Sequence, residues 1–378
     1  MKRTNDTSRR LTPRVVAGGL AAAVVLVCGL GMMPWPRLSA DITGDAVLAE
    51  RIQPLLKNPA NQVAVAYIDG GSVRYAGFGA DEHTEFEIGS VSKTFTASLL
   101  ADAVARGEVT LETTVADILG DELKDPHAEI GTVTLAELAS HRSGLPRLAL
   151  GSGAWKPLLA GQFLHRDPYR ASPAEVLEQA QDTALHDRGT IAYSNLGYAF
   201  LGQLLAQATG QSWERLLKDR LITPLQLSAT HAPVTAANLP DGAPTGRSAS
   251  GLREGAWTAN GTAPAGGIRS TAADLAAYAQ AQLDGTAPGT ASLDPQWKDD
   301  DSTSYGLAWV TSSGSGEDAG VSGGDSSAGP DITWHNGQTG GFWSMVALDR
   351  AGGRAVVLLS NVSSGQEDAA LELLRGGL

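Results

Sequence analysis

The apolar residues in the first third of the chain predict a helix, a strand hairpin and a second helix. They recur at helical spacing over residues 45–56, whereas residues 62–68 and 72–77 suit two strands. Asp69-Gly70-Gly71 lies between these strands and predicts a tight hairpin turn. Helical spacing resumes behind Ser90 and stops at Gly107, so we expect a helix that begins near Ser90.

The middle of the chain is mostly helical in pattern. From residue 109 to about 227, apolar positions follow a helical period, with loop signals at Pro126, at residues 143–146 and around residues 157–173. Residues 235–266 are rich in Gly, Pro, Ala and Thr and predict a surface loop. A further helix is expected over residues 271–283, capped by Ser270 or Thr271.

Strand patterns return near the C-terminus, over residues 305–310, 332–334 running into 342–348, and 355–359. Residues 312–329 form a low-complexity Gly/Ser/Asp insert, and a helix over residues 369–374 closes the chain. Strands at both ends with helices between them predict an α+β fold. We expect one antiparallel sheet built from both chain ends and flanked by helices, with an all-helical insertion at about residues 109–230.

Residues 1–40 have the composition of an export signal or an N-terminal membrane anchor. Several cations precede an uncharged run over residues 15–33, and Leu38-Ser39-Ala40 offers a cleavage site with small residues. The run is long enough to cross a bilayer but only moderately apolar, so both alternatives stay open. Either one predicts an extracytoplasmic protein whose residues 41–378 form the folded domain and whose membrane contact is limited to this segment.

Charge and cysteine content exclude several classes of function. The 378-residue chain has a formal net charge of −13, although residues 1–40 hold six of its Lys and Arg residues and one acidic residue. Nucleic acid is therefore not an expected partner. The one cysteine, Cys28, lies in the apolar run, and the seven histidines form no His-x-x-x-His pair. We expect no metal site and no cofactor.

Ser90 and Lys93 form the first candidate catalytic motif. Residues three apart share one helix face, so the Ser90 hydroxyl and the Lys93 amine can touch. A desolvated lysine loses pKa and can then take the proton of a serine nucleophile. Free N–H groups at the start of the helix can also stabilise an oxyanion. The alternative is an ordinary solvated pair on a helix surface.

Tyr193-Ser194-Asn195 is the second motif, at the start of a helical stretch. A tyrosinate next to Lys93 could carry the proton between Ser90 and a leaving group. The Asn195 amide can donate to a substrate carbonyl and hold Lys93 in place. The competing interpretation is a tyrosine that covers the core and an asparagine that caps a helix.

The third motif is His335-Asn336-Gly337-Gln338, at the end of the expected strand over residues 332–334. A glycine at 337 would let a substrate lie against the strand edge, and the N–H of Gln338 could join that of Ser90 around an oxyanion. His335 adds a donor, or a positive charge when protonated. The alternative is a glycine-rich turn without a chemical role.

The order Ser-x-x-Lys, Tyr-x-Asn, His-x-Gly resembles that of the penicillin-recognising serine hydrolases. It is most similar to the branch with class C β-lactamases, D-alanyl-D-alanine carboxypeptidases and related esterases. Further stretches share the resemblance, which covers roughly residues 45–365: 86–90, 138–146, 193–198, 224–227, 265–275 and 335–342.

The resemblance implies a β-lactamase/transpeptidase-like fold and a role for each motif. Ser90 would be the acylated nucleophile, Lys93 its base and Tyr193 the proton relay. Asn195 would be a polar support, His335 and Gly337 would line the cleft, and Gln338 would join Ser90 in the oxyanion hole. The implied ligands are peptidoglycan peptides or other small substrates, with β-lactams as acylating ligands.

Two departures from the family pattern leave the substrate open. His335 stands where many members have lysine, and no Arg or Lys lies within ten residues of it, so a substrate carboxylate lacks an obvious partner unless Arg269 or Arg142 reaches the cleft. We expect D-alanyl-D-alanine peptides first, then esters, then β-lactams as the main substrate. A non-catalytic module that senses wall fragments is the alternative from another class.

Overall fold

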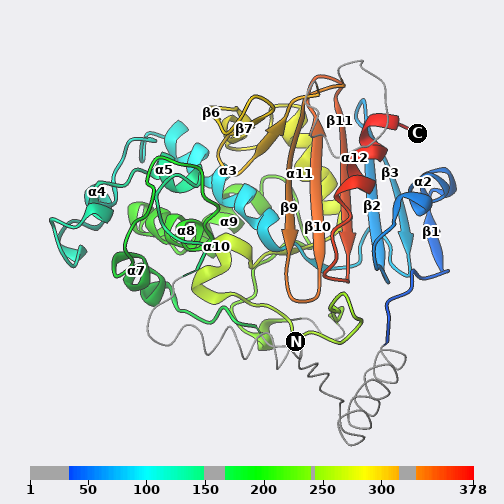
Figure 1. Ribbon diagram of the computed structural model, residues 1–378, viewed down its shortest axis with the longest axis horizontal. Helices are drawn as coiled ribbons and strands as arrows, with labels where there is room; N and C mark the ends of the chain where they lie inside the picture. Colours follow the sequence, from blue (N-terminus) through cyan, green and yellow to red (C-terminus); the bar gives the residue numbers. More distant parts are fainter. Residues whose placement is uncertain (1–33, 149–166, 240–242, 315–328) are drawn as a thin grey trace, which may run out of the picture.

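The fold is built on one nine-stranded antiparallel sheet to which both ends of the described chain contribute (Figure 1). A computed structural model describes residues 34–148, 167–239, 243–314 and 329–378. In spatial order the strands are β1 (Ile42–Gly44), β3 (Ser72–Phe78), β2 (Val63–Asp69), β11 (Arg354–Ser360), β10 (Trp343–Asp349), β9 (Ile332–Gln338), β8 (Val310–Ser312), β7 (Thr303–Tyr305) and β6 (Trp297–Lys298). This arrangement confirms the predicted α+β fold with a sheet from both chain ends.

The turn between β2 and β3 is the one that its sequence predicts. Gly70 and Gly71 both have positive φ, 55° and 83°, which a two-residue turn of this hand requires and which glycine adopts without strain. The turn sets a register in which Asp69 faces Ser72. On its other side, β2 pairs with the last strand, β11, so the β2–β3 hairpin lies within the sheet.

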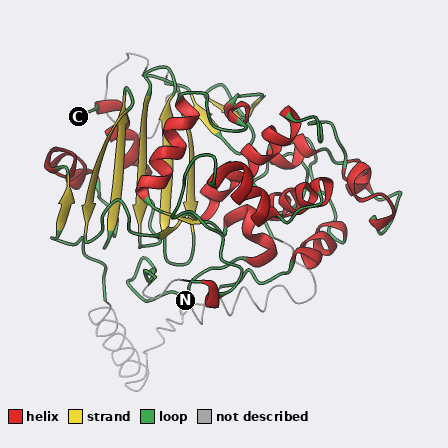
Figure 2. Cartoon of the chain, turned by 180° about the vertical axis from the view of Figure 1, so that it is seen from behind, coloured by secondary structure: helices red, strands yellow, loops and turns green. Residues whose placement is uncertain are grey.

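Helices cover both faces of the sheet (Figure 2). On one face, α2 (Ala46–Ile52) and α12 (Glu367–Gly376) pack on alternate side chains of the central strands, such as Val65 and Leu358. On the other face, α11 (Ala272–Leu283) packs on the intervening ones, such as Ala66 and Val357. This alternation is the period-two pattern of strands that are buried on both faces. The helix α3 (Ser92–Ala105) contacts α11 through Phe95 and Tyr278, whose ring centres lie 4.2 Å apart.

A helical region lies beside the sheet. In the sequence, it falls between the short strands β4 (Phe86–Glu87) and β5 (Arg269–Ser270). Its centre is α8 (Asn195–Thr209), which is buried from Leu196 to Leu205. Around it are α4 (Val115–Leu119), α5 (Leu135–Ala139), α7 (Pro173–Gln181), α9 (Trp213–Leu217) and α10 (Ala263–Gly266). Side chains at the start of α8 and of α3 can thus meet where the helical region borders the sheet.

Two expectations about secondary structure are wrong. Residues 305–310 are not one strand: the chain turns between β7 and β8, because Gly306 N–H bonds to Trp309 O and Ala308 has a φ of 68°. Residues 235–266 are not surface loop throughout, since Ala259, Gly261 and the start of α10 are buried against the helical core. Both errors arise because long-range packing outweighs local composition.

Two other expectations concern residues outside the described ranges. The export or anchor segment (residues 1–33) and most of the Gly/Ser/Asp insert (residues 315–328) belong to this part of the chain. Among the residues that are described, no helix has the length and apolar character needed to span a membrane.

Candidate active site

Ser90 lies in a single 3₁₀ turn, Gly89–Val91, that leads directly into α3. Lys93 follows one turn later on the same face, with 3.0 Å between its Nζ and Ser90 Oγ. Lys93 Nζ also donates to Asn195 Oδ1 at 2.8 Å and to the Ala265 carbonyl at 2.6 Å. The structure thus brings together Ser90, Lys93 and Asn195 as the motif spacing predicts, and adds a partner, Ala265, that the sequence did not indicate.

The partners of Lys93 fit a neutral amine. Two of them, Asn195 Oδ1 and Ala265 O, can only accept, so they use the two N–H bonds of a neutral lysine. The remaining lone pair is then directed at Ser90. Lys93 is fully buried, and this burial, aided by the cation of Arg147, lowers the pKa of Lys93 well below its usual range. Lys93 therefore has the position and the neutral, unprotonated state that a base for Ser90 requires.

Tyr193 precedes α8 and completes the group around Ser90. The Ser90 side chain lies close enough to its phenol to act on the pKa of Tyr193, and Lys93 Nζ lies 4.9 Å from the centre of the Tyr193 ring. Burial raises the pKa of Tyr193 to about 12, so the phenol keeps its proton at neutral pH. This protonation state fits a proton donor to a leaving group, and it disfavours the tyrosinate that the sequence suggested.

His141 fixes the backbone next to Tyr193, and sequence analysis did not select it as a site residue. Its Nδ1 accepts from the N–H of Ser194 at 3.1 Å, and its ring centre lies 4.5 Å from that of Tyr193. Ser194, not Asn195, caps α8, through a bond from Gly197 N–H. The Asn195 side chain is therefore available to Lys93. The stretch 138–146 gave a signal for His141 only through the family resemblance.

Gly337 and Gln338 lie inside β9 and run directly beside Gly89 and Ser90. A Cβ atom on Gly337 would lie 2.0 Å from Ile88 O and 2.9 Å from Ser90 N, and one on Gly89 would lie 2.7 Å from Gln338 N. The need for glycine at 337 is thus the close approach of the Ile88–Ser90 backbone. The close approach of a substrate, expected from the sequence, is therefore not the reason for this glycine.

The N–H of Gln338 faces the free edge of β9. The N–H of Thr339 donates to Phe342 O and therefore points toward the β10 side. Successive N–H groups of an antiparallel strand point to opposite sides, so the N–H of Gln338 points away from β10. Within the described residues, β8 pairs with β9 only as far as Trp334. The N–H groups of Ser90 and Gln338 can therefore hold one oxygen between them.

His335 differs from its expected place at the cleft edge. The side chain is buried, is not among those that line the cavity, and shares a hydrogen bond between Nδ1 and Asn336 O at 2.6 Å. Burial, together with the nearby Lys93, lowers the pKa of His335 to about 3. A neutral imidazole below the cleft floor supplies no positive charge to a ligand at neutral pH.

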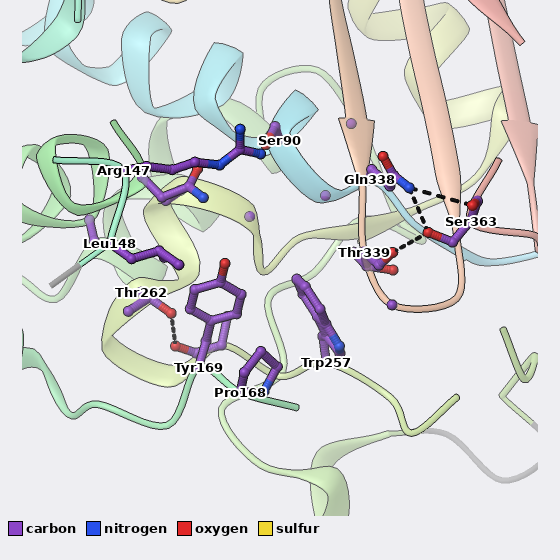
Figure 3. A pocket seen from close by; sticks show the side chains of 18 of the residues that line it. Ser90, Arg147, Leu148, Pro168, Tyr169, Trp257, Thr262, Gln338, Thr339 and Ser363 are labelled. Atoms are coloured by element: carbon purple, nitrogen blue, oxygen red, sulfur yellow. Dashed lines mark hydrogen bonds between the residues drawn. The ribbon is translucent and has the colours of Figure 1, made fainter. Parts of the chain in front are cut away.

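A cavity of about 1130 Å³ opens over Ser90, between the helical region and the β9 edge (Figure 3). The β9 side includes Gln338, whose side-chain amide donates to Ser363 Oγ at 2.8 Å. Further from Ser90, Tyr169 and Trp257 lie edge to face, with 5.0 Å between ring centres. The cavity thus has polar groups around Ser90 and an aromatic region beyond them, as in many small-molecule sites.

Neither of the two cations that the sequence proposed for a substrate carboxylate reaches this cavity. Arg269 is fully buried and paired with Glu85 at 2.5 Å and Glu87 at 2.9 Å. Arg142 does not line the cavity, and its guanidinium lies 4.9 Å from the Trp297 ring centre. The arginines that line it are Arg147 and Arg170, whose large distance from His335 in the sequence gives no sign of this position.

In the described part of the chain, no cluster of three or more His, Cys, Asp or Glu side chains could hold a metal ion.

The pKa directions predict the pH dependence of catalysis. The base must be neutral, so kcat/KM should fall as the pH drops through the lowered pKa of Lys93, and should stay level above it until Tyr193 ionises at about 12. A pH–rate profile with an uncharged ester measures this. His335→Gln should keep the acidic limb, because His335 is neutral above a pH of about 3. An acidic limb near pH 10, the range of an ordinary lysine, would contradict the assignment.

The arrangement of Ser90, Lys93 and Tyr193 in an α+β fold agrees with the family to which the chain is similar. The family described as Beta-lactamase matches residues 48–376, so the chain belongs to the beta-lactamase family, which also includes penicillin-binding proteins and D-alanyl-D-alanine carboxypeptidases. The family resemblance that the three motifs predicted is confirmed.

The proteins with similar sequences have names that refer to different functions. Penicillin-binding protein 4 of Amycolatopsis lactamdurans is 36% identical over 180 residues, which cover 45% of this chain and 43% of that protein. The D-alanyl-D-alanine-carboxypeptidase/endopeptidase AmpH of Escherichia coli (strain K12) is 26% identical over 236 residues, 59% of this chain and 58% of AmpH. The matched regions thus span about half the length of these relatives.

Solved structures confirm the fold. A D-stereospecific amidohydrolase from Streptomyces sp. superposes with a TM-score of 0.70 at 20% identity, over 88% of this chain and 99% of the other. A class C beta-lactamase from Rhodobacter sphaeroides gives 0.69 at 20% identity, over 87% and 98%. At such identities the likeness concerns the fold alone.

Proposed function

We propose that this protein is a serine hydrolase that works through an acyl-enzyme on Ser90. Neutral Lys93 takes the proton of the Ser90 hydroxyl while Oγ attacks the substrate carbonyl. The N–H groups of Ser90 and Gln338 hold the resulting oxyanion. Tyr193 then gives its proton to the leaving group and recovers one from Lys93, and an activated water releases the acyl group from Ser90. The observation that carries the proposal is the 3.0 Å distance between Nζ of buried Lys93 and Ser90 Oγ, with the other two contacts of Nζ made to acceptors.

We propose an amide of a D-alanyl-D-alanine peptide as the first substrate class, with ester hydrolysis as the alternative. The peptide is supported by the names of two relatives, a penicillin-binding protein and a D-alanyl-D-alanine carboxypeptidase/endopeptidase. Among the described residues, no strand pairs with the outer edge of β9 beyond Trp334, so its backbone groups can pair with an extended peptide. A β-lactam is proposed as an acylating ligand, and its turnover as a lesser activity.

A comparison of specificity constants tests the substrate class. We expect kcat/KM for a diacyl-D-Ala-D-Ala peptide, with release of D-alanine, to exceed that for a p-nitrophenyl ester and for nitrocefin after each is divided by its uncatalysed rate constant. The three substrates are measured on one enzyme preparation. Rapid ester turnover without any D-alanine release would replace the carboxypeptidase assignment with an esterase.

We also propose that the protein acts outside the cytoplasm. The support is the sequence of residues 1–40, in which cations precede an uncharged run. Fractionation of cells that produce the native protein should place it in the envelope or outside the cell, and N-terminal sequencing would separate a cleaved signal from a retained anchor. Full-length protein in the cytosol would refute the proposal.

A further inference from the structure

Arg147 lies at the edge of the cavity with its charge directed at the catalytic group. Figure 3 shows its side chain pointing from the helical side toward the Ser90 end of the cavity. Its guanidinium carbon lies 5.4 Å from the ring centre of Tyr193, and its charge contributes to the lowered pKa of Lys93. Arg147 is therefore close enough to act on a ligand bound at Ser90.

Nothing in the described residues neutralises Arg147 through an ion pair, although the side chain is exposed. The adjoining stretch, residues 149–166, contains no Asp or Glu in its sequence. Two acidic residues line the cavity: Glu175 accepts from the N–H of Ser172 at 2.7 Å in a helix cap, and Glu254 also has a partner of its own. Arg147 thus presents an unneutralised cation to the cavity of a protein with a net charge of −13.

The titratable side chains close to Ser90 are uncharged at neutral pH. Lys93 is uncharged when it serves as a base, the Tyr193 phenol keeps its proton, and His335 is neutral. Arg147 and Arg170 are the arginines among the described lining residues, and Arg147 is the one whose charge acts on Lys93 and Tyr193. Its planar guanidinium suits a carboxylate, which it can bind through two parallel hydrogen bonds.

We propose that Arg147 binds a carboxylate of the substrate, so that the enzyme selects anionic amides or esters over neutral ones. The inference rests on the proposed hydrolysis and names the substrate class of that site. The carboxylate can belong to the acyl part or to the leaving group, because Arg147 lies beside Tyr193, where the two parts separate. Arg147 acts in binding, whereas Ser90, Lys93 and Tyr193 perform the chemistry.

Two pairs of esters test the proposal on the full chain. The first pair is the p-nitrophenyl monoester of glutaric acid and p-nitrophenyl pentanoate, which place a charge or none on the acyl part. The second pair is thioesters of benzoylglycine with mercaptoacetate and with mercaptoacetamide, which do the same for the leaving group. Arg147→Met should lower the anionic-to-neutral ratio of kcat/KM by about 10- to 100-fold in at least one pair. Arg147→Lys should retain part of the selectivity.

Arg215→Met is the matched control, because Arg215 is an exposed arginine on α9 that pairs with Asp219 outside the cavity. It should leave both ratios unchanged. As a second readout, Arg147→Met should move the acidic limb of the neutral-ester profile to higher pH, since loss of the neighbouring cation raises the pKa of Lys93.

Ratios within about twofold of the parent in both pairs would overturn the proposal for Arg147 while leaving the hydrolase assignment intact. Failure of the parent protein to hydrolyse any ester or to form an adduct on Ser90 would refute the proposed function itself, and this inference with it.

Discussion

Replacing Lys93 with methionine is expected to lower kcat/KM by about 10²–10⁴-fold, the usual contribution of a positioned base. Methionine matches the length of the lysine stem but offers no lone pair to the Ser90 hydroxyl, 3.0 Å away. The variant should still fold, because an uncharged side chain suits a fully buried position. Hydrolysis of an ester and thermal unfolding, measured on the same preparation, check both parts.

Lys124→Met is the matched control for this substitution. Lys124 is a partly exposed lysine paired with Asp182 at 2.8 Å in the helical region. Its loss should have little effect on stability, because the pair is exposed to solvent, and should leave kcat/KM unchanged. Full activity of Lys93→Met would contradict the assignment of Lys93 as the base.

Gly337→Ala is expected to impair both folding and catalysis. The added Cβ would lie 2.0 Å from Ile88 O, a backbone atom that is fixed by a 2.7 Å bond from Ser344 Oγ. Relief of this collision separates β9 from the Ile88–Ser90 segment and should cost about 3 kcal/mol. The same shift moves Gln338 N–H away from Ser90 N–H, so we expect kcat to fall by about 10²–10³-fold. Denaturant unfolding and ester kinetics are the measurements.

Gly353→Ala is the control for Gly337→Ala, because it adds a Cβ that strains the backbone without a collision. Gly353 lies in the turn between β10 and β11 with a φ of 64°, and a Cβ there would meet nothing within 4 Å. The alanine should cost roughly 1 kcal/mol and leave activity intact. Equal losses of kcat in Gly353→Ala and Gly337→Ala would show that the collision with Ile88 O is not what matters.

Much of the fold could be predicted from local patterns. The alternation in β2 and β3, their Gly70-Gly71 turn and the helical period behind Ser90 are signals carried within a few residues. The single sheet could also be predicted, because the strand patterns at the two ends of the chain are separated by helical patterns and can pair only with one another. The hairpin of β7 and β8 could not be predicted in this way, since buried Leu307 and Trp309 in its turn read as strand residues.

The residues of the candidate site also differ in whether a local sequence pattern reveals them. Ser90, Lys93, Tyr193 and Asn195 could be selected because their chemistry is visible in short motifs. The Ala265 carbonyl and Arg147 could not, because their part in the site depends on segments that meet only in the folded chain. The place of His335 was also not predictable, since the sequence does not show how deeply β9 is buried at that point.

The central claim is that Ser90 forms the acyl-enzyme, and covalent labelling tests it most directly. The protein is incubated with a fluorophosphonate and, separately, with a penicillin, and the labelled residue is mapped by mass spectrometry. We expect one adduct per chain, on Ser90, and none on a folded Ser90→Ala variant. An intact, folded protein that gains no adduct from either reagent, or gains it on another residue, would contradict the claim and favour a non-catalytic module that binds wall fragments.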